Sequence, residues 1–257
     1  MSARVFCLDF DGVLVDSARE VGLVGYRALH TIDCAAFGSD APEAVLSAFV
    51  LARPVLETGW EAVLMLWLIQ CDKSSPADLL RDFQTVGKSR AVDQLGGQEA
   101  VMAAFHEARQ GWIDADRAGW LAAHEFYGTA VDAVKSLVMR GELVFIITTK
   151  AAEFASELLE HAGLSVPTSR VFGLGSGKKF AVLDQILQQS GAQNAIFVED
   201  RLRTLEQVQQ CGTDLVRSRT RLLLAAWGYN TAEQRARAAG LGLQVVSEDE
   251  FAQALDQ

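Results

Sequence analysis

The sequence has 257 residues, of which 50% are hydrophobic and 22% are charged, and its formal net charge is −10. This composition is too apolar for a disordered chain, and the length suffices for one large domain or for a core that carries an insert. The acidic balance argues against nucleic acid or an anionic membrane as a partner, because phosphate groups attract basic surfaces. We therefore expect a folded protein that acts on a small molecule.

The cysteines and the N-terminus indicate a compartment. The four cysteines are scattered and show no zinc-type spacing: Cys7, Cys34, Cys71 and Cys211. Acidic residues interrupt the first apolar run where a secretory signal would need an unbroken one, and nowhere do about 18 apolar residues follow one another. The sequence therefore predicts a cytoplasmic protein without a membrane span.

The first predicted strand, 4–10, is a short apolar run of the kind that is buried on both faces of a parallel sheet. Further predicted strands are 142–149, 170–175, 194–200 and 221–228, and predicted helices between them are 130–141, 151–163, 179–191 and 204–212. Strands that alternate with helices predict a parallel α/β sheet built from right-handed crossovers. This pattern covers 1–16 and 126–257.

The stretch 17–125 is different, because it shows helical periodicity and no convincing buried strand. Its clearest predicted helices are 61–70, 76–95 and 99–112. The sequence therefore predicts an all-helical insert that follows the first strand.

Two carboxylates end the first predicted strand. Asp9 and Asp11 are two residues apart and so lie on the same side of an extended chain, where two like charges repel each other unless a cation is present. Hard oxygen ligands suit Mg²⁺, which takes one or two carboxylates together with substrate phosphate. The alternative is that the two acids belong to a solvated turn or a helix cap.

Polar residues also follow the later strands, at the edge of a doubly wound sheet where ligands bind. They are Thr148 and Thr149, the lysines Lys178 and Lys179 after a glycine-rich turn, and the acids Glu199 and Asp200. Each has an ordinary structural explanation as a strand, helix-start or capping residue. Their joint placement at consecutive strand ends favours a phosphate site that contains a metal ion.

Four stretches resemble, in order, the motifs of the haloacid dehalogenase superfamily of phosphohydrolases: DFDGVLVDS, VFIITTK, GKK and IFVED. The resemblance implies a Rossmann-like, three-layer parallel-sheet core, 1–16 and 126–257, with an inserted helical cap domain, 17–125. It also implies that Asp9 is the nucleophile that becomes an aspartyl-phosphate, and that Asp11 is the acid and then the base. Thr148 would bind the phosphoryl oxygens, and a lysine would stabilise the charge.

The resemblance further implies Mg²⁺, held by Asp9, the backbone carbonyl of Asp11 and the acids of the fourth motif. That motif departs from the common GDxxxD pattern, since Glu199 replaces its glycine. Ligation then depends on Asp200, with Glu199 binding directly or through water. Helical spacing favours Lys179 over Lys178 as the site lysine, because Lys179 shares a face with the apolar residues Val182, Leu183 and Ile186.

The resulting hypothesis is a Mg²⁺-dependent phosphatase of a small phosphorylated metabolite, with Thr149 and Arg53 as candidate substrate-binding residues. Arg53 would bind a distal anionic group of the substrate, or else is a solvated helix-end residue. The presence of Asp11 favours phosphate esters over halides and phosphonates in this superfamily. A sugar phosphomutase and a binding protein of weak activity stay as alternatives, and the assembly is expected to be a monomer or a homodimer.

Overall fold

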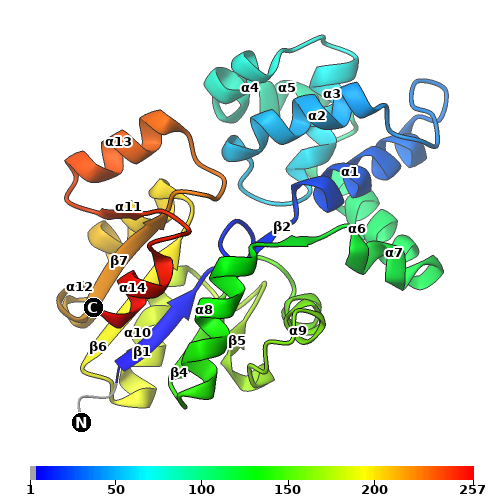
Figure 1. The fold of residues 1–257 in the computed structure, drawn as a ribbon. Coiled ribbons are helices and arrows are strands. Elements are labelled where there is room, and N and C mark those ends of the chain that lie inside the picture. Colours follow the sequence, from blue (N-terminus) through cyan, green and yellow to red (C-terminus); the bar gives the residue numbers. More distant parts are fainter. Residues whose placement is uncertain (1–3) are drawn as a thin grey trace. The chain divides into compact units, whose positions relative to one another are not determined.

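The computed structural model describes residues 4–257 and divides into two compact units (Figure 1). One unit comprises the described chain up to Asp16 together with Phe126–Gln257, and the other is Ser17–Glu125. The chain leaves the first unit after strand β2 (Val15–Asp16) and returns to it at strand β3 (Glu125–Phe126). Within residues 4–257, no helix is both long and apolar enough to cross a membrane.

The first unit is built on a six-stranded sheet in which neighbouring strands run parallel, so the predicted α/β class is confirmed. In spatial order the strands are β5 (Val171–Phe172), β4 (Leu143–Ile147), β1 (Arg4–Leu8), β6 (Asn194–Glu199), β7 (Thr220–Ala225) and β8 (Gln244–Val246). Strand β1 lies in the middle and pairs with β4 and β6, placing Leu8 beside Ile146 and Val198. The short strand β8 had no counterpart in the sequence prediction.

Helices cover both faces of this sheet (Figure 1). Because successive side chains of a strand point to opposite faces, Val5 and Cys7 share one face, where they pack in a core cluster with residues of α10 (Lys179–Ser190) and α11 (Leu202–Cys211). On the other face, α8 (Gly128–Met139) packs against α14 (Phe251–Asp256). The remaining helical segments are α9 (Ala152–His161), η3 (Thr168–Arg170), α12 (Asp214–Arg219) and α13 (Ala232–Gly240).

The second unit is helical, as the sequence predicted. Its helices are α1 (Ala18–Ile32), α2 (Glu43–Ala52), η1 (Arg53–Val55), α3 (Glu61–Gln70), α4 (Pro76–Asp82), α5 (Lys88–Gln94), α6 (Gln98–Ala115) and α7 (Arg117–Ala122). The prediction of a single helix over 76–95 is wrong. A π-helical turn, Phe83–Gly87, separates α4 from α5 and shifts the helical register between them.

A buried carboxylate joins three helices of this unit. Glu20 of α1 is fully buried and accepts two hydrogen bonds from Arg109 of α6, at 2.8 and 2.9 Å. Its Oε1 atom also accepts from the indole N–H of Trp120 in α7, at 3.0 Å. A buried charge is tolerated when it is paired and hydrogen-bonded in this way, so these contacts fix how α1, α6 and α7 pack.

Candidate active site

The position of Asp9 follows from the alternation of β1. Asp9 continues the series of Val5 and Cys7 and therefore lies on the α10 face of the sheet, at the carboxyl end of the strand. Its backbone N–H donates to the Val198 carbonyl at 2.9 Å, which continues the pairing with β6. The residue is 6% exposed, and its Oδ1 accepts from the N–H of Phe10 at 2.8 Å. The backbone thus fixes this carboxylate.

Lys179 is the first residue of α10 and bridges two buried acids. Its Nζ lies 2.7 Å from Asp9 Oδ1 and 2.7 Å from Glu199 Oε2. Glu199 ends β6 and is fully buried on the same face, because it continues the alternation of Ala195 and Phe197. Lys178, by contrast, is the exposed residue that precedes α10. The structure therefore brings Lys179 to the acids.

Three buried acids form the metal-competent part of the site. Carboxylate oxygens of Asp9, Glu199 and Asp200 all lie within 4.8 Å of one another. Both oxygens of Glu199 have protein donors, since Oε2 contacts Lys179 and Oε1 accepts from the N–H of Arg201 at 3.1 Å. Hard carboxylate oxygens that lie this close together could hold a divalent cation.

Burial and like charge shape the titration of this cluster. Burial, together with the nearby charge of Glu199, raises the pKa of Asp9 to about 7, and Lys179 only partly opposes this rise. Burial also raises the pKa of Glu199, although Lys179 lowers it. For Lys179 burial favours the neutral amine, but the carboxylates of Asp9 and Glu199 outweigh it and raise the pKa above its usual range. Lys179 alone therefore does not fully offset the cost of ionising these neighbouring acids, so a further cation would favour their charged forms.

Glycines let Asp200 approach the turn after β1. Gly12 has φ +85°, and a Cβ atom there would lie 2.1 Å from Asp200 Oδ2. A Cβ atom at Gly228 would lie 2.4 Å from the Cβ of Asp200 and 2.2 Å from the Gly12 carbonyl oxygen. Both positions therefore require glycine, and together they form a cradle for the Asp200 carboxylate.

The loop after β7 supports Asp200, and the sequence analysis missed its role. The N–H of Tyr229 donates to Asp200 Oδ2 at 2.7 Å, and the Asn230 amide donates to the Asp200 carbonyl at 2.9 Å. The Tyr229 hydroxyl donates to Asp16 at 2.7 Å. The only available signal was Gly228, a glycine directly after a buried strand, since such glycines often permit close backbone approach.

Thr148 lies at the end of β4, where its N–H donates to the Phe172 carbonyl at 2.9 Å. It is buried, and its Oγ1 accepts from the N–H of Lys150 at 3.0 Å. Thr149, predicted to bind substrate, is exposed. Arg53 belongs to the helical unit, where it is buried and its Nη1 donates to the Leu56 carbonyl at 3.4 Å.

Lys150 is a second buried lysine that the sequence analysis did not single out. Its Nζ lies 3.2 Å from Oδ1 of Asp11, and its side chain is 4% exposed. The signal was its spacing, because Lys150 is two residues beyond Thr148 at a strand end that already carried polar residues. The core unit thus supplies one lysine to Asp9 and Glu199 and another to Asp11.

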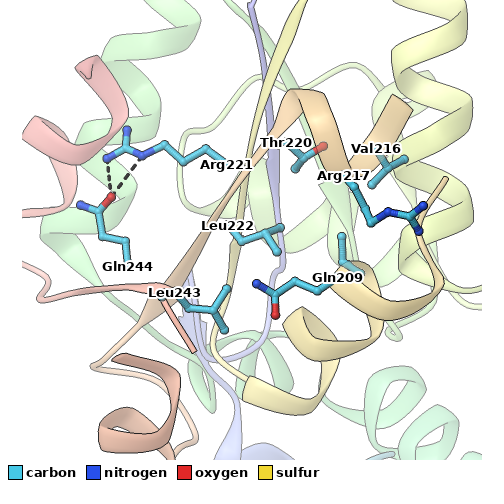
Figure 2. Close-up of a pocket in the computed structure, with 10 residues that line it drawn as sticks. Gln209, Val216, Arg217, Thr220, Arg221, Leu222, Leu243 and Gln244 are labelled. Atoms are coloured by element: carbon cyan, nitrogen blue, oxygen red, sulfur yellow. Dashed lines mark hydrogen bonds between the residues drawn. The ribbon is translucent and has the colours of Figure 1, made fainter. Parts of the chain in front are cut away.

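A separate cavity of about 480 Å³ lies near the opposite end of the sheet, at the start of β7 and β8 (Figure 2). Leu222 and Leu243 line it together with polar residues, and Arg221 donates to the Gln244 side chain at 3.1 Å beside it. No carboxylate is among its lining residues. The chemistry predicted from the motifs therefore belongs to the other end of the strands.

Comparisons with solved structures identify the fold. A predicted phosphatase from Clostridium acetobutylicum is similar at 16% identity and a TM-score of 0.61, with 99% of each chain covered. A haloacid dehalogenase-like hydrolase from Streptococcus pneumoniae is similar at 16% identity and a TM-score of 0.57, over 100% of this chain and 99% of that one. A haloacid dehalogenase-family hydrolase from Deinococcus radiodurans, with bound phosphate and sodium, is similar at 17% identity and a TM-score of 0.55. This match covers 99% of this chain and 95% of that one.

No protein-family model and no curated protein sequence matches the chain. The structural matches nevertheless span almost the whole chain. The chain therefore has the haloacid dehalogenase-like fold that the four sequence motifs predicted.

Proposed function

We propose that this protein is a Mg²⁺-dependent phosphohydrolase that removes phosphate from a small phosphorylated metabolite. The observation that carries the proposal is the contact of Lys179 with both Asp9 and Glu199, beside Asp200, at the carboxyl edge of the sheet. Similar folds that are named as phosphatases, and one that holds phosphate, support it. The helical unit, Ser17–Glu125, is proposed to be the cap that selects the substrate.

In the proposed reaction, a carboxylate oxygen of Asp9 attacks the phosphorus of the ester and the bond to the leaving oxygen breaks. Asp11 gives a proton to that oxygen, so the product is an alcohol. Asp11 then takes a proton from a water molecule that attacks the aspartyl-phosphate, which releases inorganic phosphate and restores both carboxyl groups. Thr148 and Lys179 contribute hydrogen bonds and positive charge to the phosphoryl oxygens.

Asp9 and Asp200 would hold the Mg²⁺, together with the backbone carbonyl of Asp11. When bound, the ion supplies the positive charge that lets an anionic nucleophile approach an anionic ester. Glu199 is proposed to hold Lys179 in place, because Lys179 and the N–H of Arg201 contact its two carboxylate oxygens. Lys179 is thus held with its ammonium group 2.7 Å from Asp9 Oδ1.

The proposal is tested by phosphate release from an aryl phosphate in the presence of Mg²⁺. We expect turnover by the wild-type protein and none above background for Asp9→Asn. Asp132→Asn is the matched control, because the side chain of this aspartate of α8 is 80% exposed and its carboxylate pairs with Lys135 at 4.0 Å. Equal turnover of the Asp9 variant and the control would refute the proposal. Conversion of a sugar monophosphate without phosphate release would show a phosphomutase instead.

A further inference from the structure

Lys150 is buried in a place where a lysine is costly to keep. Its side chain is 4% exposed, so its charge is largely removed from water and its long side chain has lost rotamer freedom. The backbone of Lys150 is fixed on both sides, because its N–H donates to Thr148 Oγ1 at 3.0 Å and its carbonyl accepts from the N–H of Leu174 at 2.9 Å. The ammonium group is therefore held at a defined point.

The acid at that point is Asp11. The Nζ of Lys150 lies 3.2 Å from Asp11 Oδ1, while the other site lysine, Lys179, contacts Asp9 and Glu199. The torsion that orients an aspartate carboxylate has a broad energy minimum, so a fixed partner determines which way the oxygens face. Asp11 is 17% exposed at its side chain, which leaves it accessible to a substrate from one side.

We propose that Lys150 is a positioning residue for Asp11: it holds one carboxylate oxygen so that the proton transfers to the leaving oxygen and from water occur at a fixed geometry. The inference rests on the proposed function, in which Asp11 performs both transfers. Residues that orient a reacting group typically contribute about 10- to 100-fold to activity. Lys150 thereby joins Thr148 as a second buried polar residue in the segment that follows β4.

The test is steady-state kinetics of Lys150→Met in two backgrounds, the wild-type protein and Asp11→Asn, with an aryl phosphate and Mg²⁺. Methionine keeps the backbone N–H and carbonyl that bond Thr148 and Leu174, and fills a similar volume. The matched control is Lys135→Met, because Lys135 of α8 is 37% exposed and pairs with Asp132 at the surface. Lys150→Arg and Lys150→Gln provide a charged and an uncharged variant if methionine prevents folding.

We expect kcat of Lys150→Met to fall by about 10- to 100-fold while KM changes by less than about threefold, with partial rescue by arginine. In the Asp11→Asn background the same change should alter the residual rate by less than about twofold, since two residues that act as a unit are not additive. The Lys135 control should leave both constants unchanged.

Two results would overturn the inference while the wild-type protein is active. A raised KM with unchanged kcat in both backgrounds would show that Lys150 binds the substrate itself. Kinetics of Lys150→Met equal to those of Lys135→Met would show that it has no role in turnover. Absence of phosphate release by the wild-type protein would instead refute the proposed function, and the inference with it.

Discussion

Substituting Gly12 with alanine should damage the site in a way that can be separated from ordinary backbone strain. Gly12 has φ +85°, which costs a residue with a Cβ atom about 1–2 kcal/mol. The added Cβ would also lie 2.1 Å from Asp200 Oδ2, about 1.3 Å short of the 3.4 Å at which ordinary contact begins. Overpacking of this kind costs about 1–3 kcal/mol more.

Two further glycines separate these effects. Gly141 has φ +75° and nothing within 4 Å of its Cβ position, so Gly141→Ala carries the strain alone. Gly228 has no positive φ, but its Cβ would meet Gly12 and Asp200, so Gly228→Ala carries the overlap alone. For a chain of this size, 1 kcal/mol lowers Tm by about 2–4 °C, which predicts a fall of roughly 2–8 °C for Gly141→Ala and 4–20 °C for Gly12→Ala.

The assay that distinguishes the variants is Tm measured with and without Mg²⁺, together with phosphate release. Gly12→Ala and Gly228→Ala should lose most of the Mg²⁺-induced rise in Tm and about 100-fold or more in turnover, because both displace Asp200. Gly141→Ala should keep both properties. Equal Mg²⁺ responses in Gly12→Ala and Gly141→Ala would refute the assignment of the glycine cradle to the metal ligand.

Lys179→Met should abolish turnover and lower Tm, because it leaves the buried carboxylates without their cation. Lys178→Met changes the exposed neighbouring residue and should retain activity. A reversed outcome would reassign the site lysine. Tyr229→Phe removes the hydrogen bond from the hydroxyl to Asp16 but keeps the backbone N–H that donates to Asp200. The free energy of unfolding, measured by denaturant titration, should therefore fall by about 1–3 kcal/mol, while the Mg²⁺-induced rise in Tm stays the same. The pKa of Asp9 is raised to about 7, so a proton competes with the ion for this carboxylate below about pH 7 and is largely absent above it. The Mg²⁺-induced rise in Tm should therefore be larger at about pH 8 than at about pH 6. An equal rise at the two pH values would argue that Asp9 is not a ligand.

The sheet and the first carboxylates could be predicted because local rules decide them. Apolar runs placed Asp9 and Glu199 at strand ends, and helical spacing placed Lys179 on the apolar face of the helix that became α10. The structure brings these three side chains into contact. Arg53 and Thr149 had no such rule behind them: Arg53 belongs to the helical unit, and Thr149 is exposed.

What could not be predicted depends on how loops return in three dimensions. Lys150 and Tyr229 reach Asp11 and Asp200 only because neighbouring strands place their following loops side by side, and strand order is not written in any local pattern. The π-helical turn Phe83–Gly87 also went unforeseen, since its residues continue the apolar periodicity of a helix. Tertiary packing outweighs local propensity at such positions.

The central position of β1 has a consequence for how the protein folds. Its neighbours in the sheet are β4 and β6, which come from distant parts of the chain, so the core has many contacts of large sequence separation. Such contacts form slowly, because the chain entropy of long loops must be lost before they contribute. Asp9 and Asp200 therefore meet only after β1 has paired with β6, and an ion bound between them would stabilise states in which that long-range pairing is complete.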